Sequence, residues 1–169
     1  MPIKTLNEKF VHELGDIYDA EHRFRESMQK MAKEASTSEL KQMLEKHIGE
    51  TDDQIKNLEE VFKLMGEKAE RVKCDGAAGL VSEAEKGLKE AKGAPDIVDL
   101  LILASTSKAE HYEISSYHGL IVGAEQMGQK EVAELFKANL EQEEKTSKLV
   151  EKTIPKRLKE AMQAEAEGQ

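Results

Sequence analysis

Acidic side chains and one histidine occupy positions that apolar residues would fill in an ordinary helix. Apolar residues recur at steps of three and four along four long segments, which is the period of an amphipathic helix. These stripes also carry residues that can bind a metal ion: Glu21, His47, Glu50, Glu110, Glu113 and Glu143. A buried charge costs several kcal/mol unless it is paired or bound to a metal, so the pattern indicates a polar site inside a helical protein.

Electrostatic repulsion decides what a cluster of carboxylates requires. Two carboxylates about 4 Å apart repel by about 4 kcal/mol even at an effective dielectric constant near 20. Five of them cannot all be ionised in a dry core without compensating positive charge. Two divalent cations supply that charge, and carboxylate and imidazole ligands suit iron or manganese better than metals that prefer thiolates. We therefore predict two divalent metal ions, with iron preferred and manganese as the alternative.

The order of the segments suggests a role for each candidate ligand. Glu50 and Glu143 come from the second helix of each helical pair, and we expect them to bridge the two ions. The other candidates would each bind one ion: Glu21, His47, Glu110 and Glu113. A glutamate on an apolar stripe also fits a residue that extends to solvent or an interface, and a lone core histidine also fits a structural role. Tyr117, one turn after Glu113, fits either a hydrogen-bond partner of the site or a core tyrosine.

Four long helices are predicted to position these residues. Their approximate ranges are 3–35, 36–65, 96–127 and 129–154. Ser36 and Glu39 fit a capping box at the start of the second helix, and Asp96 is the expected N-cap of the third. A glycine follows the second helix and another follows the third, and each is placed to end its helix. Pro155 is expected to end the fourth helix.

The lengths of the connections predict how these helices are arranged. Short turns join the first helix to the second and the third to the fourth, so each pair must be an antiparallel hairpin. At about 1.5 Å per residue, the candidate ligands lie roughly 20–23 Å from the turn in the first hairpin and roughly 22–27 Å in the second. A long crossover, 67–94, joins the hairpins and contains a short helix over about 80–91. This arrangement is all-α, a ferritin-like four-helix bundle of two antiparallel hairpins with a long crossover.

The domain organisation and the composition exclude several classes of protein and partner. Residues 1–155 are assigned to the bundle and 156–169 to a polar C-terminal tail that is expected to fray. The formal net charge of −9 argues against a nucleic-acid partner, which needs a clustered basic face. The longest nearly apolar run, 97–104, is too short to span a membrane and contains Asp99. The first residues have no apolar signal-peptide core, so a cytoplasmic location is expected. The single Cys74 excludes sites with four cysteines, and the sequence leaves its role open.

Four sequence motifs resemble one family of proteins. The second segment contains HIGET at 47–51, and the third contains EHYEI at 110–114 followed by Tyr117. The crossover contains Cys74 followed by GL at 79–80 and EA at 83–84, and the fourth segment contains LEQE at 140–143. Over nearly the whole chain these motifs are similar to the YciE/YciF-type ferritin-like proteins of bacteria.

The resemblance implies a rubrerythrin-like bundle with a dinuclear metal site, usually dimeric and associated with stress responses. The six candidate ligands occupy the matching positions. The wider ferritin pattern Glu-x-x-His would place histidines at positions 53 and 146, where this chain has Asp53 and Thr146, so the site is poor in histidine. The lone cysteine excludes a built-in rubredoxin, so any turnover needs an external electron donor.

Two classes of function follow from these observations. The first is a dinuclear iron or manganese protein that reacts with peroxide or oxygen in stress protection. The alternative is a structural bundle, stabilised by metal or free of it, that acts through a homodimer surface without catalytic turnover. Storage inside a hollow cage is less favoured, because no segment identifies the interfaces that a cage needs.

Overall fold

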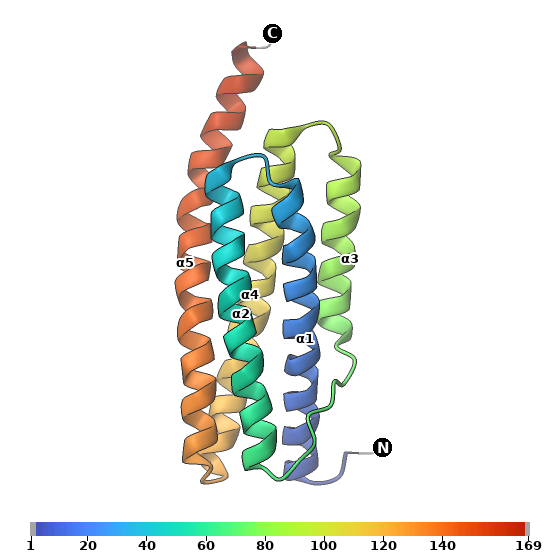
Figure 1. The fold of residues 1–169 in the computed structure, drawn as a ribbon, viewed down its shortest axis with the longest axis vertical. Coiled ribbons are helices and arrows are strands. Elements are labelled where there is room, and N and C mark those ends of the chain that lie inside the picture. The colour runs from blue at the N-terminus through green and yellow to red at the C-terminus, as the bar shows by residue number, and fades with distance from the viewer. Residues whose placement is uncertain (1–2, 168–169) are drawn as a thin grey trace.

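Five helices make up the computed structural model, which describes residues 3–167, and no strand occurs in that range. They are α1 (Leu6–Glu34), α2 (Ser38–Leu64), α3 (Asp75–Glu90), α4 (Pro95–Gln126) and α5 (Lys130–Glu167). Figure 1 shows α1, α2, α4 and α5 side by side along the long axis of the molecule, while α3 packs against α1 and α4. The prediction of an all-α protein is therefore confirmed.

The connections between the helices are of two kinds. Short turns join α1 to α2 and α4 to α5, and the helices of each pair run in opposite directions (Figure 1). The longer connection from α2 to α3 passes along α1, where the Val72 N–H donates a hydrogen bond to the Gly15 carbonyl at 3.0 Å. The two predicted glycine stops are confirmed, because Gly66 and Gly128 follow α2 and α4 with φ values of 72° and 74°.

The starts of α2, α3 and α4 differ from the predictions. The predicted capping box of Ser36 and Glu39 is wrong: Thr37 is the N-cap of α2, and its hydroxyl accepts the Leu40 N–H at 3.4 Å. Ser36 is not available, because its hydroxyl donates to the carboxylate of Asp99 at 2.8 Å.

At the start of α4, Asp96 is not the N-cap. Pro95 is the first helical residue and Ala94 precedes it without a side-chain hydrogen bond, so Asp96 falls inside the first turn. A proline suits this position because its missing N–H would have no helical partner there. The helix α3 begins at Asp75, earlier than predicted, because the thiol of Cys74 accepts the Ala77 N–H at 3.3 Å. Cysteine is not among the common N-cap residues, so the sequence carries no usual start signal at this place.

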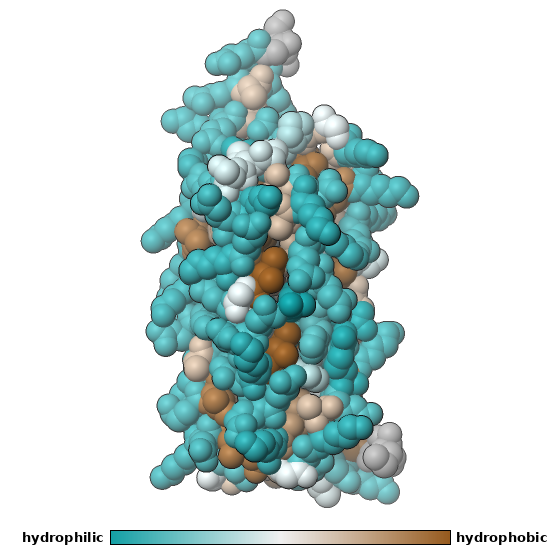
Figure 2. Space-filling view, in the orientation of Figure 1, coloured by the Kyte–Doolittle hydropathy of each residue, from teal (hydrophilic) through white to brown (hydrophobic). Residues whose placement is uncertain are grey.

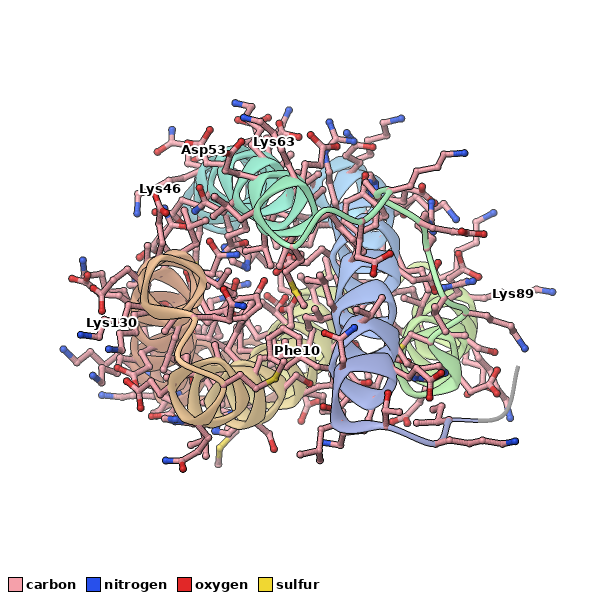
Figure 3. The ribbon with its side chains drawn as sticks, turned by 90° about the horizontal axis from the view of Figure 1, so that it is seen from below. Phe10, Lys46, Asp53, Lys63, Lys89 and Lys130 are labelled. Atoms are coloured by element: carbon pink, nitrogen blue, oxygen red, sulfur yellow. The ribbon has the colours of Figure 1, made fainter. Side chains whose placement is uncertain are left out.

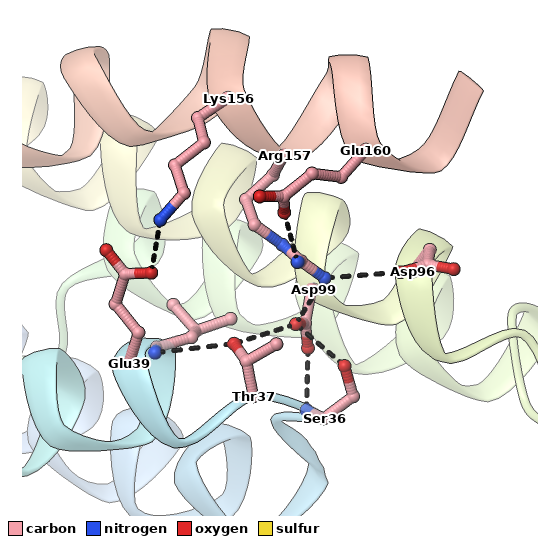
Figure 4. A network of polar contacts seen from close by, with 9 residues as sticks. Ser36, Thr37, Glu39, Asp96, Asp99, Lys156, Arg157 and Glu160 are labelled. Atoms are coloured by element: carbon pink, nitrogen blue, oxygen red, sulfur yellow. Dashed lines mark hydrogen bonds and ion pairs between the residues drawn. The ribbon is translucent and has the colours of Figure 1, made fainter. Parts of the chain in front are cut away.

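The prediction that Pro155 ends the last helix is also wrong, because α5 continues to Glu167. A proline inside a helix costs about 3 kcal/mol, so other contacts must hold the chain helical beyond it. Arg157 supplies them: it is only 9 % exposed and lies 3.0 Å from Asp99 and 3.2 Å from Asp96. Figure 4 shows this network joining α5, α4 and the turn between α1 and α2. Residues 168–169 of the predicted tail lie outside the described residues.

The core consists of two apolar clusters with polar residues between them. One cluster contains Phe10, Leu14 and Phe136, and the other contains Met28 and Leu103. Each of the four long helices passes from one cluster to the other, and each carries buried polar side chains on the way. The candidate ligands therefore lie where the apolar packing is interrupted.

The surface is mostly hydrophilic. Figure 2 shows charged and polar residues over most of the visible face, with apolar residues in small separate patches. Figure 3 shows Phe10 between the helices, while Lys46, Lys63 and Lys130 point outward. None of the helices in the described range is long and apolar enough to cross a membrane.

Candidate metal centre

The structure brings five of the six candidate ligands together. Ligand atoms of His47, Glu110 and Glu143 all lie within 4.8 Å of one another. The same holds for ligand atoms of Glu21, Glu113 and Glu143. Each of these five side chains is at most 3 % exposed. Because Glu143 belongs to both groups, the arrangement offers two neighbouring ion positions that share one carboxylate.

Each of the four long helices contributes at least one side chain to this cluster, because the face that carries the ligand points into the protein. Glu21 comes from α1, His47 from α2 and Glu143 from α5. Glu110 and Glu113 both come from α4, where residues three apart share one face of the helix. The side chains meet because all four helices turn the same face, otherwise apolar, toward the interior.

Glu50 differs from the other candidates. Its side chain is 24 % exposed and belongs to neither group of converging ligand atoms. Its carboxylate lies 3.5 Å from His47 Nδ1 and 2.8 Å from the Lys46 ammonium. Hydrogen bonding to His47, and then to Lys46, lowers the pKa of Glu50 to about 2. The structure thus places Glu50 beside the candidate ligand His47 and pairs it with the surface residue Lys46. The role of Glu50 as a bridging ligand stays a prediction.

His47 is the positively charged partner of the carboxylates. Its Nε2 lies 2.8 Å from Glu110 Oε1 and 3.8 Å from Glu143 Oε2. Burial by itself lowers the pKa of His47, but the charge and hydrogen bond of Glu110 outweigh it and raise the pKa to about 9. A metal ion binds the neutral ring, so metal would take the place of this proton.

The chain's departures from the wider histidine-rich pattern have visible consequences. The Thr146 hydroxyl stands where that pattern has a histidine, and it lies 3.3 Å from His47 Nδ1. Asp53, at the other such position, is exposed and pairs with Lys56 at 2.8 Å. The threonine therefore orients the ring of the one buried histidine, while the aspartate has no contact with the cluster in this structure.

Tyr117 contacts the cluster and is also part of the core. It is fully buried, and its hydroxyl donates a hydrogen bond to Glu21. The amide of Asn139 donates to the Tyr117 oxygen at 3.0 Å and is itself fixed by the Gln54 carbonyl at 3.2 Å. The two roles that the sequence left open for Tyr117 are thus combined in one side chain.

Two amides near the cluster were not singled out from the sequence. Gln54 is fully buried and its Nε2 donates to Glu143. Asn139 holds Tyr117 as described above. Gln54 could have been found, because it lies on the apolar stripe one turn beyond Glu50 and a buried amide needs partners. Asn139 carries no comparable signal, since the stripe of its helix runs through its neighbour Leu140.

Burial of the carboxylates raises their pKa values and leaves some of their oxygen atoms without hydrogen-bond donors. It raises the pKa of Glu21 to about 7, against the lowering effect of the Tyr117 hydrogen bond. Burial, strengthened by neighbouring carboxylates, also raises the pKa values of Glu113 and Glu143 well above their ordinary range. One oxygen atom each of Glu21, Glu110 and Glu143 is buried without a hydrogen-bond partner. Buried carboxylate oxygens that lack donors and converge are what a cation requires, so the residues present fit a metal centre.

Cys74 lies at a different place. Its thiol is buried at the start of α3, 2.9 Å from the Tyr112 hydroxyl, and it belongs to neither ligand group. The ligand set is therefore four carboxylates and one imidazole, with no sulfur. Such a set suits iron or manganese better than a metal that prefers thiolates.

Comparison with known proteins gives consistent results. The family model described as Domain of unknown function (DUF892) matches residues 5–163. Protein YciF of Escherichia coli strain K12 is 35 % identical over 147 residues, which cover 86 % of this chain and 88 % of YciF.

Solved structures agree with this relationship. The crystal structure described as the E. coli stress protein YciF covers 93 % of this chain and 99 % of its own, at 32 % identity and a TM-score of 0.87. YcfI from Rhodopseudomonas palustris, described as a proposed structural protein, covers 88 % of this chain and 94 % of its own, at 34 % identity and a TM-score of 0.85.

Proposed function

The chain belongs to the DUF892 family, and we propose that it is a ferritin-like four-helix bundle protein that binds two divalent metal ions, iron in preference to manganese. The observation that carries this proposal is the pair of buried ligand groups that share Glu143. One position would use His47 and Glu110 with Glu143, and the other would use Glu21 and Glu113 with Glu143. Four carboxylates would balance the charge of two divalent ions, which removes the repulsion that the metal-free cluster carries.

The proposed chemistry is reduction of peroxide or oxygen. Two bound ferrous ions would supply the two electrons that, with two protons, reduce one molecule of hydrogen peroxide to two molecules of water. The chain's own residues hold the ligands in place: Tyr117 orients Glu21, Gln54 orients Glu143, and Thr146 orients His47. Burial of all five ligands keeps bulk water from the centre. An external donor would have to return the electrons, since the described part of the chain contains no second group of metal ligands elsewhere.

A structural role without turnover is the second candidate. The description of the Rhodopseudomonas palustris relative as a proposed structural protein favours it. So do the exposed apolar residues Leu158 and Met162, which lie four residues apart on one side of α5 and offer a surface for a second copy of the chain. We propose a homodimer under either function. The name of the E. coli relative, a stress protein, supports a role in stress protection for both candidates.

Metal analysis of protein purified without added metal tests the proposal. The wild-type protein should bind about two ions per chain after anaerobic loading with iron or manganese. Glu143→Gln should lose affinity at both positions, because this carboxylate is shared. The matched control is Glu141→Gln, which changes an exposed glutamate on the same helix and should bind as the wild type does. Less than about half an ion per chain in the loaded wild type would refute the metal centre.

Mixing experiments separate the two candidate functions. Anaerobic di-iron(II) protein is mixed in a stopped-flow instrument with hydrogen peroxide and, separately, with oxygen. Rapid oxidation of one equivalent per site, followed by slow or no cycling until a reductant is added, supports the redox function. A ferrous site that survives both oxidants for minutes leaves the structural function as the better one. A manganese-filled protein is assayed for peroxide disproportionation instead.

A further inference from the structure

The crossover helix α3 covers one side of the proposed metal centre. It lies at the edge of the molecule, next to α1 and α4 (Figure 1). A cavity lies between these three helices, and its lining includes His47, Glu110 and Glu113. These three residues come from both groups of converging ligand atoms. Both proposed ion positions can therefore be reached from the side of α3.

The mouth of this cavity is partly open to solvent. Leu80 and Val81 of α3 and Ser105 and Ala109 of α4 line it, and all four are only half-buried. The free space inside is about 20 Å³, whereas a single water molecule needs roughly 10–15 Å³. A divalent ion in water carries a shell of about six water molecules. Such an ion can reach the ligands only when the walls of the cavity move apart.

Of the three helices around the cavity, α3 is the least firmly packed. Only Ala77 and Ala84 are buried in it, whereas α1 and α4 bury large parts of their inner faces. Three glycines lie inside this helix of 16 residues, Gly76, Gly79 and Gly87, and glycine is one of the poorest helix formers. A short helix of this composition depends on its packing, and few buried contacts give low local stability. The wall that opens most readily is therefore α3.

Two ion pairs at the surface hold the middle of α3 against its neighbours. The Lys30 ammonium of α1 lies 2.6 Å from the Glu85 carboxylate, and the Lys108 ammonium of α4 contacts the Glu83 carboxylate. All four side chains are exposed, so salt screens these pairs and each contributes little to stability. These contacts can be broken and made again without disturbing the core.

The first turn of α3 is anchored more firmly. The buried carboxylate of Asp19 on α1 accepts the Cys74 N–H at 2.9 Å and pairs with Arg71 at 2.8 Å. The Cys74 thiol also lies 2.9 Å from the Tyr112 hydroxyl of α4. Opening therefore concerns the part of α3 after its first turn, residues 78–90.

The approach to the centre from the side of α2 is less suited to a cation. There the part-exposed Glu50 lies 3.5 Å from His47 Nδ1, and the Lys46 ammonium lies 2.8 Å from the same carboxylate. The positive charge of Lys46 repels an incoming cation. Among the described residues, none that line the cavity beneath α3 is a lysine or an arginine.

We propose that residues 78–90 of α3 open as a lid and that divalent cations enter the metal centre beneath them. The entry of ions rests on the proposed function, whereas the opening of α3 is a property of the metal-free fold. The lid sets how fast ions bind and not how tightly, because it is closed both before and after binding.

Hydrogen exchange of backbone amides tests the opening without metal. In full-length protein with chelator, amides of residues 78–90 should exchange at least about tenfold faster than those in the middle of α1 and α4. Gly79→Ala should slow this exchange about two- to fivefold, because alanine stabilises the helix. A Cβ at this exposed position meets no atom within 4 Å. The matched control is Gly119→Ala, an equally exposed and uncontacted glycine of α4, which should leave the exchange of α3 unchanged.

The rate of Mn(II) uptake tests the entrance. Metal-free protein is mixed rapidly with Mn(II), and the electron paramagnetic resonance signal of the free ion is followed as it disappears. Gly79→Ala should slow uptake by the same two- to fivefold and change the dissociation constant by less than about twofold. Ser82→Gly, an exposed change that weakens α3, should speed both uptake and exchange about twofold. Gly119→Ala should match the wild type in rate and affinity.

The two measurements must agree for the proposal to stand. Exchange of residues 78–90 as slow as that of α1 and α4 would overturn it. So would uptake at the wild-type rate in a variant whose α3 exchange has changed, which would place the entrance elsewhere and keep the metal centre. A wild type that takes up no Mn(II) would refute the proposed function and the entrance together, and fast exchange of residues 78–90 would then remain as a property of the fold.

Discussion

Replacing Glu21 by glutamine should stabilise the metal-free protein at high pH. Burial raises the pKa of Glu21 from 4.5 to about 7. The folded protein therefore holds this proton more tightly than the unfolded chain does. The stabilisation that comes from this tighter proton binding is complete below about pH 4.5 and is lost as the pH rises through 7. At about 1.36 kcal/mol per pKa unit, the loss amounts to about 3 kcal/mol above pH 7.

The glutamine side chain removes this cost and keeps most of the local contacts. An amide cannot ionise, and its oxygen can still accept the hydrogen bond that Tyr117 donates to Glu21. In the presence of chelator, Glu21→Gln should therefore exceed the wild type in free energy of unfolding by about 2–3 kcal/mol at pH 8 and by less than about 1 kcal/mol at pH 4.5. Urea denaturation followed by circular dichroism measures both differences. Glu26→Gln, an exposed change five residues further along α1, is the matched control and should stay within about 0.5 kcal/mol at either pH.

Bound metal should make the wild type more stable than Glu21→Gln, the reverse of the order in chelator. At about 1,000 times the dissociation constant, Mn(II) stabilises a folded protein that binds it by about 4.1 kcal/mol. This exceeds the lead of about 2–3 kcal/mol that the variant has in chelator, and the variant lacks one ligand. Wild type should then be the more stable protein at pH 8. A variant that is no more stable than wild type at pH 8 with chelator would refute the reasoning about the buried charge. A variant that remains the more stable protein in saturating Mn(II) would refute the role of Glu21 as a ligand.

Three further predictions concern the rest of the chain. Asp99→Ala should lower the free energy of unfolding by about 2–3 kcal/mol in urea denaturation, because it removes the buried carboxylate and leaves Arg157 only the part-exposed Asp96 and Glu160. Adding Arg157→Met should recover part of the loss, and no recovery would contradict this account. Thr37→Ala should cost about 1 kcal/mol through loss of the N-cap of α2, whereas Ser38→Ala should cost less than half as much. Light scattering at micromolar concentration should show a dimer, and a single species of 18.9 kDa would exclude it.

The sequence by itself determined the helices and the polar nature of their inner faces. The helical period is a local property, so apolar residues three and four apart identify each long helix without knowledge of its neighbours. The same period identified Glu21, His47, Glu110, Glu113 and Glu143, since a charged residue on an apolar stripe is visible in the stripe itself. Glycine stops were equally clear, because a glycine after a helix allows the positive φ that other residues avoid.

Only the tertiary structure decided which of these residues meet and which elements continue. Glu50 shares the predicted stripe with His47, yet its side chain is 24 % exposed and its carboxylate pairs with Lys46 at 2.8 Å. The helix continues past Pro155 because Arg157 finds Asp99, a residue 58 positions away in the chain. The same aspartate engages Ser36 and so moves the start of α2. Partners far apart in sequence leave no periodic trace, because their pairing depends on how the helices are packed rather than on any local pattern.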